Sequence, residues 1–141
     1  MKQIKARELW TCPQCRRQFE RQGQSHSCRP FALEQHFINR ATSERLYKKL
    51  IQDLENQIDS FKIESLECCI HLVSGFTFAA IRIMKNKIRV EFTLSDNIQH
   101  DRFYRCVQMS AHRYLYLVDV KTEADIDPEL IQWIKDAQDK K

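Results

Sequence analysis

The sequence predicts an α+β fold, an antiparallel meander sheet with helices packed on one face, preceded by a small cysteine-bearing N-terminal segment. Two observations predict it. Apolar residues recur every three or four positions over 46–58 and 130–137, whereas they alternate with polar residues over most of 66–120. Residues 1–30 show neither period and contain a cluster of cysteine and histidine residues. Helical patterns that flank a run of strand patterns are typical of α+β domains.

Length and charge divide the chain at about residue 40. The 141 residues, 43% of them hydrophobic, suit one domain with a short appendage. Residues 1–40 carry eight Lys and Arg against three Asp and Glu, a net charge of +5, whereas residues 41–141 carry fifteen against sixteen, a net of −1. We therefore expect a separate segment over 1–40 and an α+β domain over 41–141. The positive charge of the segment points to an anionic partner.

Two helices are expected before the strands. Pro30 needs no backbone donor at a first helical position, and the short apolar pattern FALEQHFI follows it. A longer helix begins after Asn39, with Thr42 or Ser43 as its N-cap. Its core-facing stripe consists of Leu46, Tyr47, Leu50, Ile51, Leu54 and Ile58.

The strand pattern begins at about residue 62, and its residues alternate over 66–73 before a turn at Gly75. A hairpin follows, with its turn at Lys85-Asn86. Residues 95–101 are typical of a loop. Two more strands, over 103–109 and 114–120, complete the meander, and Asp127-Pro128 then caps and begins a final helix.

The strongest motif is Cys12-x2-Cys15-x10-His26-x-Cys28. Two cysteines separated by two residues close a tight turn in which both thiolates face one ion, and the second pair completes the four N and S ligands that zinc prefers. His26 and Cys28 point the same way if their segment is extended. His36 competes with His26 for the fourth position, because the spacing from Cys15 to Cys28 also fits a two-Cys, two-His finger.

A structural zinc ion is the favoured interpretation, which makes the N-terminal segment zinc-knuckle-like. The alternatives are a redox pair, which lacks the βαβ context of a thioredoxin-like site, and unrelated buried thiols. Four protein ligands leave no position open for catalysis, and Zn²⁺ binding would contribute about 10–16 kcal/mol to the folding of a segment without a core. The remaining cysteines, Cys68, Cys69 and Cys106, are expected to be buried thiols in strands.

Two sets of basic residues are candidates for binding an anion or nucleic acid. The first surrounds the cysteine motif as a rim and consists of Arg16, Arg17, Arg21 and Arg29. The second is on the predicted hairpin and consists of Arg82, Lys87 and Arg89. If Ile83 faces Ile88, Arg82 lies opposite Arg89. Like charges directly opposite are destabilising, so either Glu91 or Glu67 compensates them or the hairpin binds an anion.

Several classes of function are disfavoured. A chain with two glycines has no Gly-rich phosphate loop. His71, His100 and His112 are scattered without a nucleophile or a paired carboxylate, so we expect no catalytic residues and favour a binding module over an enzyme. No apolar run approaches the roughly 20 residues of a membrane span, and the charged N-terminus has no signal-peptide pattern. We therefore expect a cytoplasmic protein without a membrane partner.

These motifs resemble a known family. LWTCPQCRRQF and QSHSC, followed by FALEQHF, are similar to the N-terminal segment of small uncharacterised bacterial proteins. The remainder, through FTFAAIRI, KIRVEFTLS, YLYLV and DIDPELIQWIKDA, resembles the domain-of-unknown-function family 5655. The resemblance implies an α+β domain without an established activity. His26 and His36 both match family positions, so the resemblance leaves the fourth zinc ligand open.

Together these features predict a non-catalytic binding module with structural Zn²⁺ as its cofactor. Its basic N-terminal segment is expected to contact nucleic acid or a nucleic-acid enzyme. The alternative is a protein- or small-molecule-interaction domain in which zinc only stabilises the N-terminus.

Overall fold

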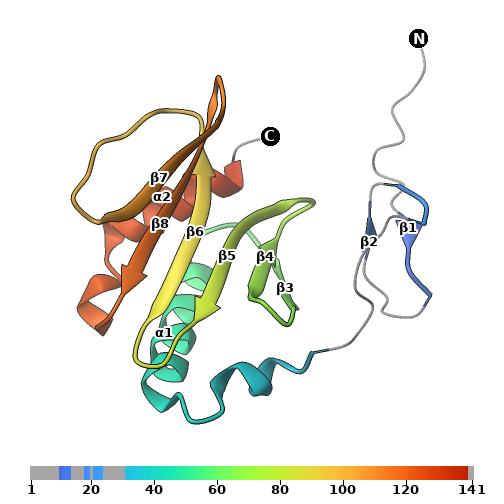
Figure 1. The fold of residues 1–141 in the computed structure, drawn as a ribbon, viewed down its shortest axis with the longest axis horizontal. Helices are drawn as coiled ribbons and strands as arrows, with labels where there is room; N and C mark the ends of the chain where they lie inside the picture. The colour runs from blue at the N-terminus through green and yellow to red at the C-terminus, as the bar shows by residue number, and fades with distance from the viewer. Residues whose placement is uncertain (1–9, 14–17, 20, 24–30, 140–141) are drawn as a thin grey trace. The chain divides into compact units, whose positions relative to one another are not determined.

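The computed structural model describes residues 10–13, 18–19, 21–23 and 31–139, and it divides the chain into two compact units, Met1–Phe31 and Ala32–Lys141 (Figure 1). In the first unit, β1 (Trp10–Thr11) pairs antiparallel with β2 (Gln18–Phe19). The short helix that the sequence placed with this segment is the 3₁₀ helix η1 (Leu33–Phe37), which belongs to the second unit.

The second unit contains a six-stranded antiparallel sheet and two α-helices, which confirms the α+β class. Its helices are α1 (Ala41–Gln57) and α2 (Pro128–Asp139), and the 3₁₀ helix η2 (Glu123–Asp125) precedes α2. Its strands are β3 (Lys62–Ser65), β4 (Ile70–Val73), β5 (Thr77–Ile83), β6 (Ile88–Leu94), β7 (Phe103–Ser110) and β8 (Arg113–Val120).

Helix α1 buries its predicted stripe but begins earlier than predicted. Arg40 occupies the N-cap position without a side-chain cap, and Asn39 turns the chain into the helix with a positive φ of 59°. Ser43 lies inside the first turn and is fully buried, and its hydroxyl is satisfied there by the carbonyl oxygens of Met84 and Lys87. The prediction of Thr42 or Ser43 as the cap is therefore wrong: the Ser43 hydroxyl binds the β5–β6 turn instead of the helix backbone.

The strand pattern predicted from about residue 62 does not continue unbroken through 66–73. Residues 62–65 and 70–73 form two strands, β3 and β4, in a hairpin in which Ser65 pairs with Ile70. The four residues between them form a turn that is closed by a hydrogen bond of 2.9 Å from the Leu66 amide to the Cys69 carbonyl. The alternation of apolar residues continued through this turn, so periodicity alone did not reveal it.

The sheet follows the predicted meander only as far as β6. The strand order is β3-β4-β5-β6-β8-β7, so β8 pairs with β6 and β7 lies at the edge. Residues 95–102 carry the chain past the position of β8 (Figure 1). Burial agrees with this order: alternate residues in the second half of β8 are buried, whereas every residue of β7 is exposed or half-buried, as suits an edge strand.

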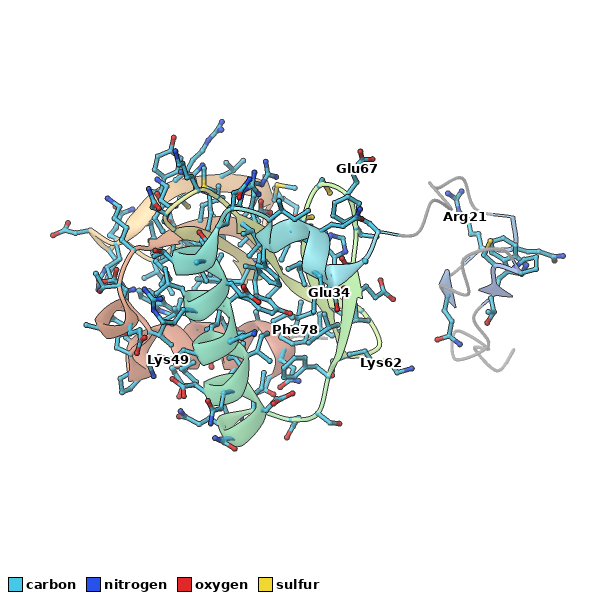
Figure 2. The ribbon with its side chains drawn as sticks, turned by 90° about the horizontal axis from the view of Figure 1, so that it is seen from below. Arg21, Glu34, Lys49, Lys62, Glu67 and Phe78 are labelled. Atoms are coloured by element: carbon cyan, nitrogen blue, oxygen red, sulfur yellow. The ribbon has the colours of Figure 1, made fainter. Side chains whose placement is uncertain are left out.

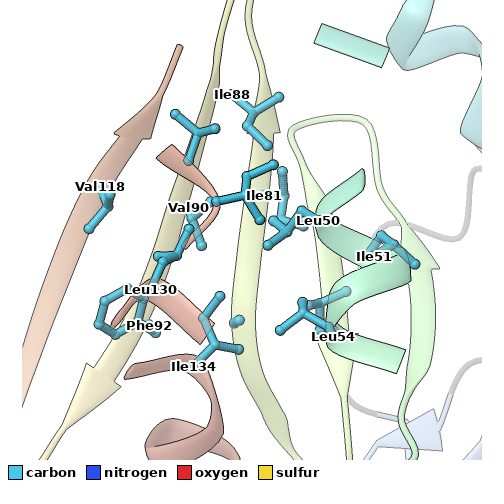
Figure 3. Packing of buried hydrophobic residues seen from close by; sticks show 14 of the residues in the cluster. Leu50, Ile51, Leu54, Ile81, Ile88, Val90, Phe92, Val118, Leu130 and Ile134 are labelled. Carbon is cyan, nitrogen blue, oxygen red and sulfur yellow. The ribbon is translucent and has the colours of Figure 1, made fainter. Parts of the chain in front are cut away.

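The hydrophobic core lies between one face of the sheet and both helices, as predicted. Phe78 on β5 points into this layer, whereas Lys62 and Glu67 lie at the periphery (Figure 2). Leu50 and Leu54 of α1 and Leu130 and Ile134 of α2 approach the same sheet residues (Figure 3). Those sheet residues include Ile81, Ile88, Val90, Phe92 and Val118.

The opposite face of the sheet, here called the outer face, carries polar residues that alternate with the core. It includes Arg82 on β5, Arg89 and Glu91 on β6, and Asp119 on β8. Register places them together, because Arg82 pairs with Arg89 and Arg89 pairs with Asp119.

Helix α2 begins as the sequence predicts. Its first residue is Pro128, and Asp127 Oδ1 accepts a hydrogen bond of 3.0 Å from the Leu130 amide. Asp127 also pairs with Arg102 at 2.9 Å, and Arg102 donates to the Asp125 carbonyl at 2.6 Å. These contacts fasten the loop before β7 to the start of α2.

Candidate functional site

The β1–β2 pair positions the first of the predicted zinc ligands. Trp10 pairs with Phe19 and Thr11 with Gln18, so Cys12 lies at the point where the chain leaves β1 for the connection that contains Cys15. Cys12 is 3% exposed. Such a short hairpin is a suitable support for the motif, because β1 and β2 flank the connection that contains Cys12 and Cys15.

The donor set fits zinc better than a hard cation, because three thiolates and one imidazole are ligands of borderline softness. Of the four predicted ligands, the structure describes Cys12, whereas Cys15, His26 and Cys28 lie outside the described residues. Within the described part of the chain, no three His, Cys, Asp or Glu side chains gather as a metal site.

His36, the alternative fourth ligand, is buried on η1 in the second unit. Its Nε2 lies 3.1 Å from the hydroxyl of Ser65 at the end of β3. Burial lowers the pKa of His36, which a hydrogen bond with the Leu66 backbone partly opposes. His36 is therefore a neutral imidazole near neutral pH that holds η1 to the β3–β4 turn.

Of the predicted basic rim, the structure describes only Arg21, which is exposed in the N-terminal unit (Figure 2). Arg16, Arg17 and Arg29 lie outside the described residues.

The second basic set lies on the outer face with the register predicted from the sequence, because Arg82 is directly opposite Arg89. Each cation has a carboxylate partner. Arg89 donates to both oxygens of Asp119, at 2.6 and 3.1 Å, and Lys87 donates to one of them at 2.9 Å. Arg82 lies 3.7 Å from Glu91, which confirms Glu91 as a compensating residue.

Asp119 is the residue that sequence reasoning missed. The hydrogen bond from Arg89 is the main cause that holds the pKa of Asp119 below its usual value, and Lys87 adds to it. Arg89 also lies over the ring of Tyr104, with its central carbon 3.9 Å from the ring centroid. The alternation of β8 placed Asp119 on a polar face, but its partner could be found only from the non-local pairing of β8 with β6.

The three cysteines outside the N-terminal motif differ from the expectation of buried thiols in strands. Cys69 is buried, but Cys68 and Cys106 are exposed. Cys68 and Cys69 occupy the β3–β4 turn, whereas Cys106 lies on the edge strand β7. The turn and the edge position of β7, both missed from the sequence, account for this exposure.

Comparison with known proteins finds one family. The model of a family described as "Domain of unknown function (DUF5655)" matches residues 33–140. No curated protein and no solved structure matches the chain. The match covers nearly the same residues as the second compact unit. None of the helices in the described part of the chain is long and apolar enough to cross a membrane.

Proposed function

Because the chain belongs to the DUF5655 family, whose description assigns no activity, we propose a function from its own residues. The protein is a non-catalytic, cytoplasmic binding module whose N-terminal segment folds around one structural zinc ion and contacts nucleic acid. The observation that carries the proposal is the division of charge: residues 1–40 have a net charge of +5, and the rest of the chain has −1.

The proposed zinc ligands are Cys12, Cys15, His26 and Cys28. Their spacing supports the site, as does the burial of Cys12 at the end of a two-stranded hairpin. His26 is preferred over His36, because His36 already binds Ser65 within the second unit. In this proposal the zinc ion supplies folding energy to a segment too short for its own core and does no chemistry.

The proposed nucleic-acid contacts come from the N-terminal rim and not from the outer face of the sheet. Arg89 and Lys87 are bound to Asp119, so contact with a phosphate would first require these hydrogen bonds to break. Arg21 is exposed. In the sequence, Arg16 and Arg17 lie with it between Cys15 and His26, and Arg29 directly follows Cys28. Cations clustered in this way bind phosphates mainly by releasing counterions.

A second candidate function is a protein-interaction domain in which zinc only stabilises the N-terminus. Edge strand β7 favours it, because Tyr104 and Met109 are 61% and 54% exposed there. An edge strand with exposed apolar side chains offers both backbone groups and side chains to a partner strand.

A salt titration tests the nucleic-acid proposal. The zinc-loaded protein should bind duplex DNA or single-stranded RNA at roughly 50 mM salt, with log affinity falling linearly against log salt by about 0.9 per phosphate contacted on the duplex. A variant with Arg16, Arg17, Arg21 and Arg29 changed to Gln should lose most of that slope.

The matched control changes Arg82, Lys87 and Arg89 to Gln and should keep the slope. No binding to either nucleic acid at low salt by a folded, zinc-loaded protein would overturn the proposal and favour the protein-interaction function. If the control variant lost as much of the salt slope, the nucleic-acid contact would be assigned to the outer face and not to the N-terminal rim.

A further inference from the structure

The β3–β4 turn brings two adjacent thiols together. Cys68 and Cys69 follow one another in the turn, and their Sγ atoms lie 3.0 Å apart. The turn is held on both sides, since Ser65 pairs with Ile70 and the Leu66 amide donates to the Cys69 carbonyl at 2.9 Å. The two sulfur atoms are therefore close before any bond forms between them.

The two thiols have different surroundings. Cys68 is exposed beside Glu67, whose side chain projects away from the domain (Figure 2). Cys69 is 7% exposed, and burial, followed by its hydrogen bond with Cys68, raises its pKa to about 12. Arg82 opposes this shift, because its positive charge favours the Cys69 thiolate. A dissolved reagent therefore reaches Cys68 first. Its attachment removes the hydrogen bond with the Cys68 thiol, one of the causes that raise the pKa of Cys69, and leaves Cys69 Sγ beside the modified sulfur.

We propose that Cys68 and Cys69 form a reversible dithiol–disulfide site that closes by exchange with disulfides of low-molecular-weight thiols. The proposal rests on the β3–β4 turn alone and is independent of the zinc and nucleic-acid proposals.

The exchange proceeds in two thiol–disulfide exchange steps. The Cys68 thiolate attacks one sulfur of the small disulfide, forms a mixed disulfide and releases the first small thiolate. The Cys69 thiolate then attacks Cys68 Sγ, which forms the Cys68–Cys69 bond and releases the second small thiolate. The two cysteine protons pass to the two leaving thiolates. The protein loses two electrons and the small disulfide gains them.

Covalent geometry makes such a bond reversible. Neighbouring Cα atoms are about 3.8 Å apart, which is closer than the roughly 4.4–6.8 Å that an unstrained disulfide usually spans. A disulfide formed at that separation is strained and therefore easily reduced. This is the behaviour of a regulatory pair and not of a structural crosslink.

Peptide mapping of the full chain tests the proposal. The purified full-length protein is treated with glutathione disulfide, its remaining thiols are alkylated, and it is digested with trypsin. Cleavage after Lys62 and Arg82 yields residues 63–82, which contain Cys68 and Cys69 and no other cysteine. We expect this peptide to lose two hydrogens without retaining glutathione, and to regain them in dithiothreitol.

Cys106 provides an internal control, because it is exposed and has no neighbouring cysteine in sequence. It should hold glutathione as a stable mixed disulfide in the same sample. Changing Cys69 to Ser should trap glutathione on Cys68, changing Cys68 to Ser should leave the peptide unmodified, and changing Cys106 to Ser should leave closure unaltered.

The proposal fails if the wild-type 63–82 peptide retains glutathione for as long as Cys106 does, or if it stays unmodified while Cys106 reacts. This comparison is made within the wild-type protein, so it holds even if replacement of the buried Cys69 prevents folding.

Discussion

Asp119 on β8 joins two cationic side chains, Arg89 on β6 and Lys87 in the turn before β6. Its two oxygens accept hydrogen bonds from Arg89 and Lys87, and all three side chains are largely shielded from water. Without this carboxylate, Arg89 would face Arg82 across the β5–β6 pair with Glu91 as the remaining carboxylate in contact. The role of Asp119 is thus to make the register of two opposed arginines tolerable.

We expect Asp119→Asn to lower the free energy of unfolding by about 2 kcal/mol at pH 7, because a charged and largely shielded hydrogen-bond acceptor is lost. Glu91→Gln is the matched control. Glu91 meets the more exposed Arg82 at a longer distance, so its loss should cost less than about 0.5 kcal/mol. Denaturant unfolding measures both, and equal costs would contradict this account of Asp119.

The Arg89–Asp119 pair also makes the free energy of unfolding depend on pH. Because the folded chain holds the pKa of Asp119 below its usual value, the unfolded chain takes up this proton first as the pH falls. The stabilisation is therefore fully present above about pH 4 and is lost as acidification passes through the folded pKa. The difference in stability between wild type and Asp119→Asn should narrow below about pH 4 in the same unfolding experiment.

At the scale of the elements, the period of the apolar residues correctly predicted those helices and strands that bury one face. Helices α1 and α2 and the β5–β6 hairpin each present a single apolar face to the core, so the sequence period located them. It failed in two places. A local turn between Leu66 and Cys69 interrupts an apolar alternation, and the non-local pairing of β8 with β6 leaves β7 at the sheet edge. The same limit applied to function, since Arg82 opposite Arg89 followed from a local turn, whereas Asp119 required the β6–β8 pairing.

Ser43 shows how one element fixes another. It anchors the first turn of α1 to the β5–β6 turn through the carbonyls of Met84 and Lys87, while Arg40 donates to the Ile83 carbonyl at 2.9 Å. Ser43→Ala should therefore lower stability by about 1–2 kcal/mol. Thr42→Ala, one position earlier on α1, should change it by less than about 0.5 kcal/mol. Thermal unfolding of both variants measures these losses. A larger loss for Thr42→Ala than for Ser43→Ala would restore Thr42 as the N-cap.

At the scale of the whole molecule, the two units are expected to depend on different sources of stability. Every residue of the hydrophobic core cluster lies between Phe37 and Ala137, within the part matched by the family. The proposed zinc ion is the counterpart of that core in the N-terminal unit. Loss of the metal should therefore unfold one unit and spare the other.

Elemental analysis should find about one zinc per chain. Chelation should abolish the dispersed amide NMR signals of residues 10–23 while shifting the melting temperature of the sheet domain by less than about 2 °C.

The fourth zinc ligand is identified by two variants. His26→Ala should lose zinc. His36→Ala should keep zinc but lower the melting temperature, because it removes a buried side chain bound to Ser65. Loss of zinc from His36→Ala alone would assign the fourth ligand to His36, and a chain that takes up no zinc at all would remove the metal from the proposed function.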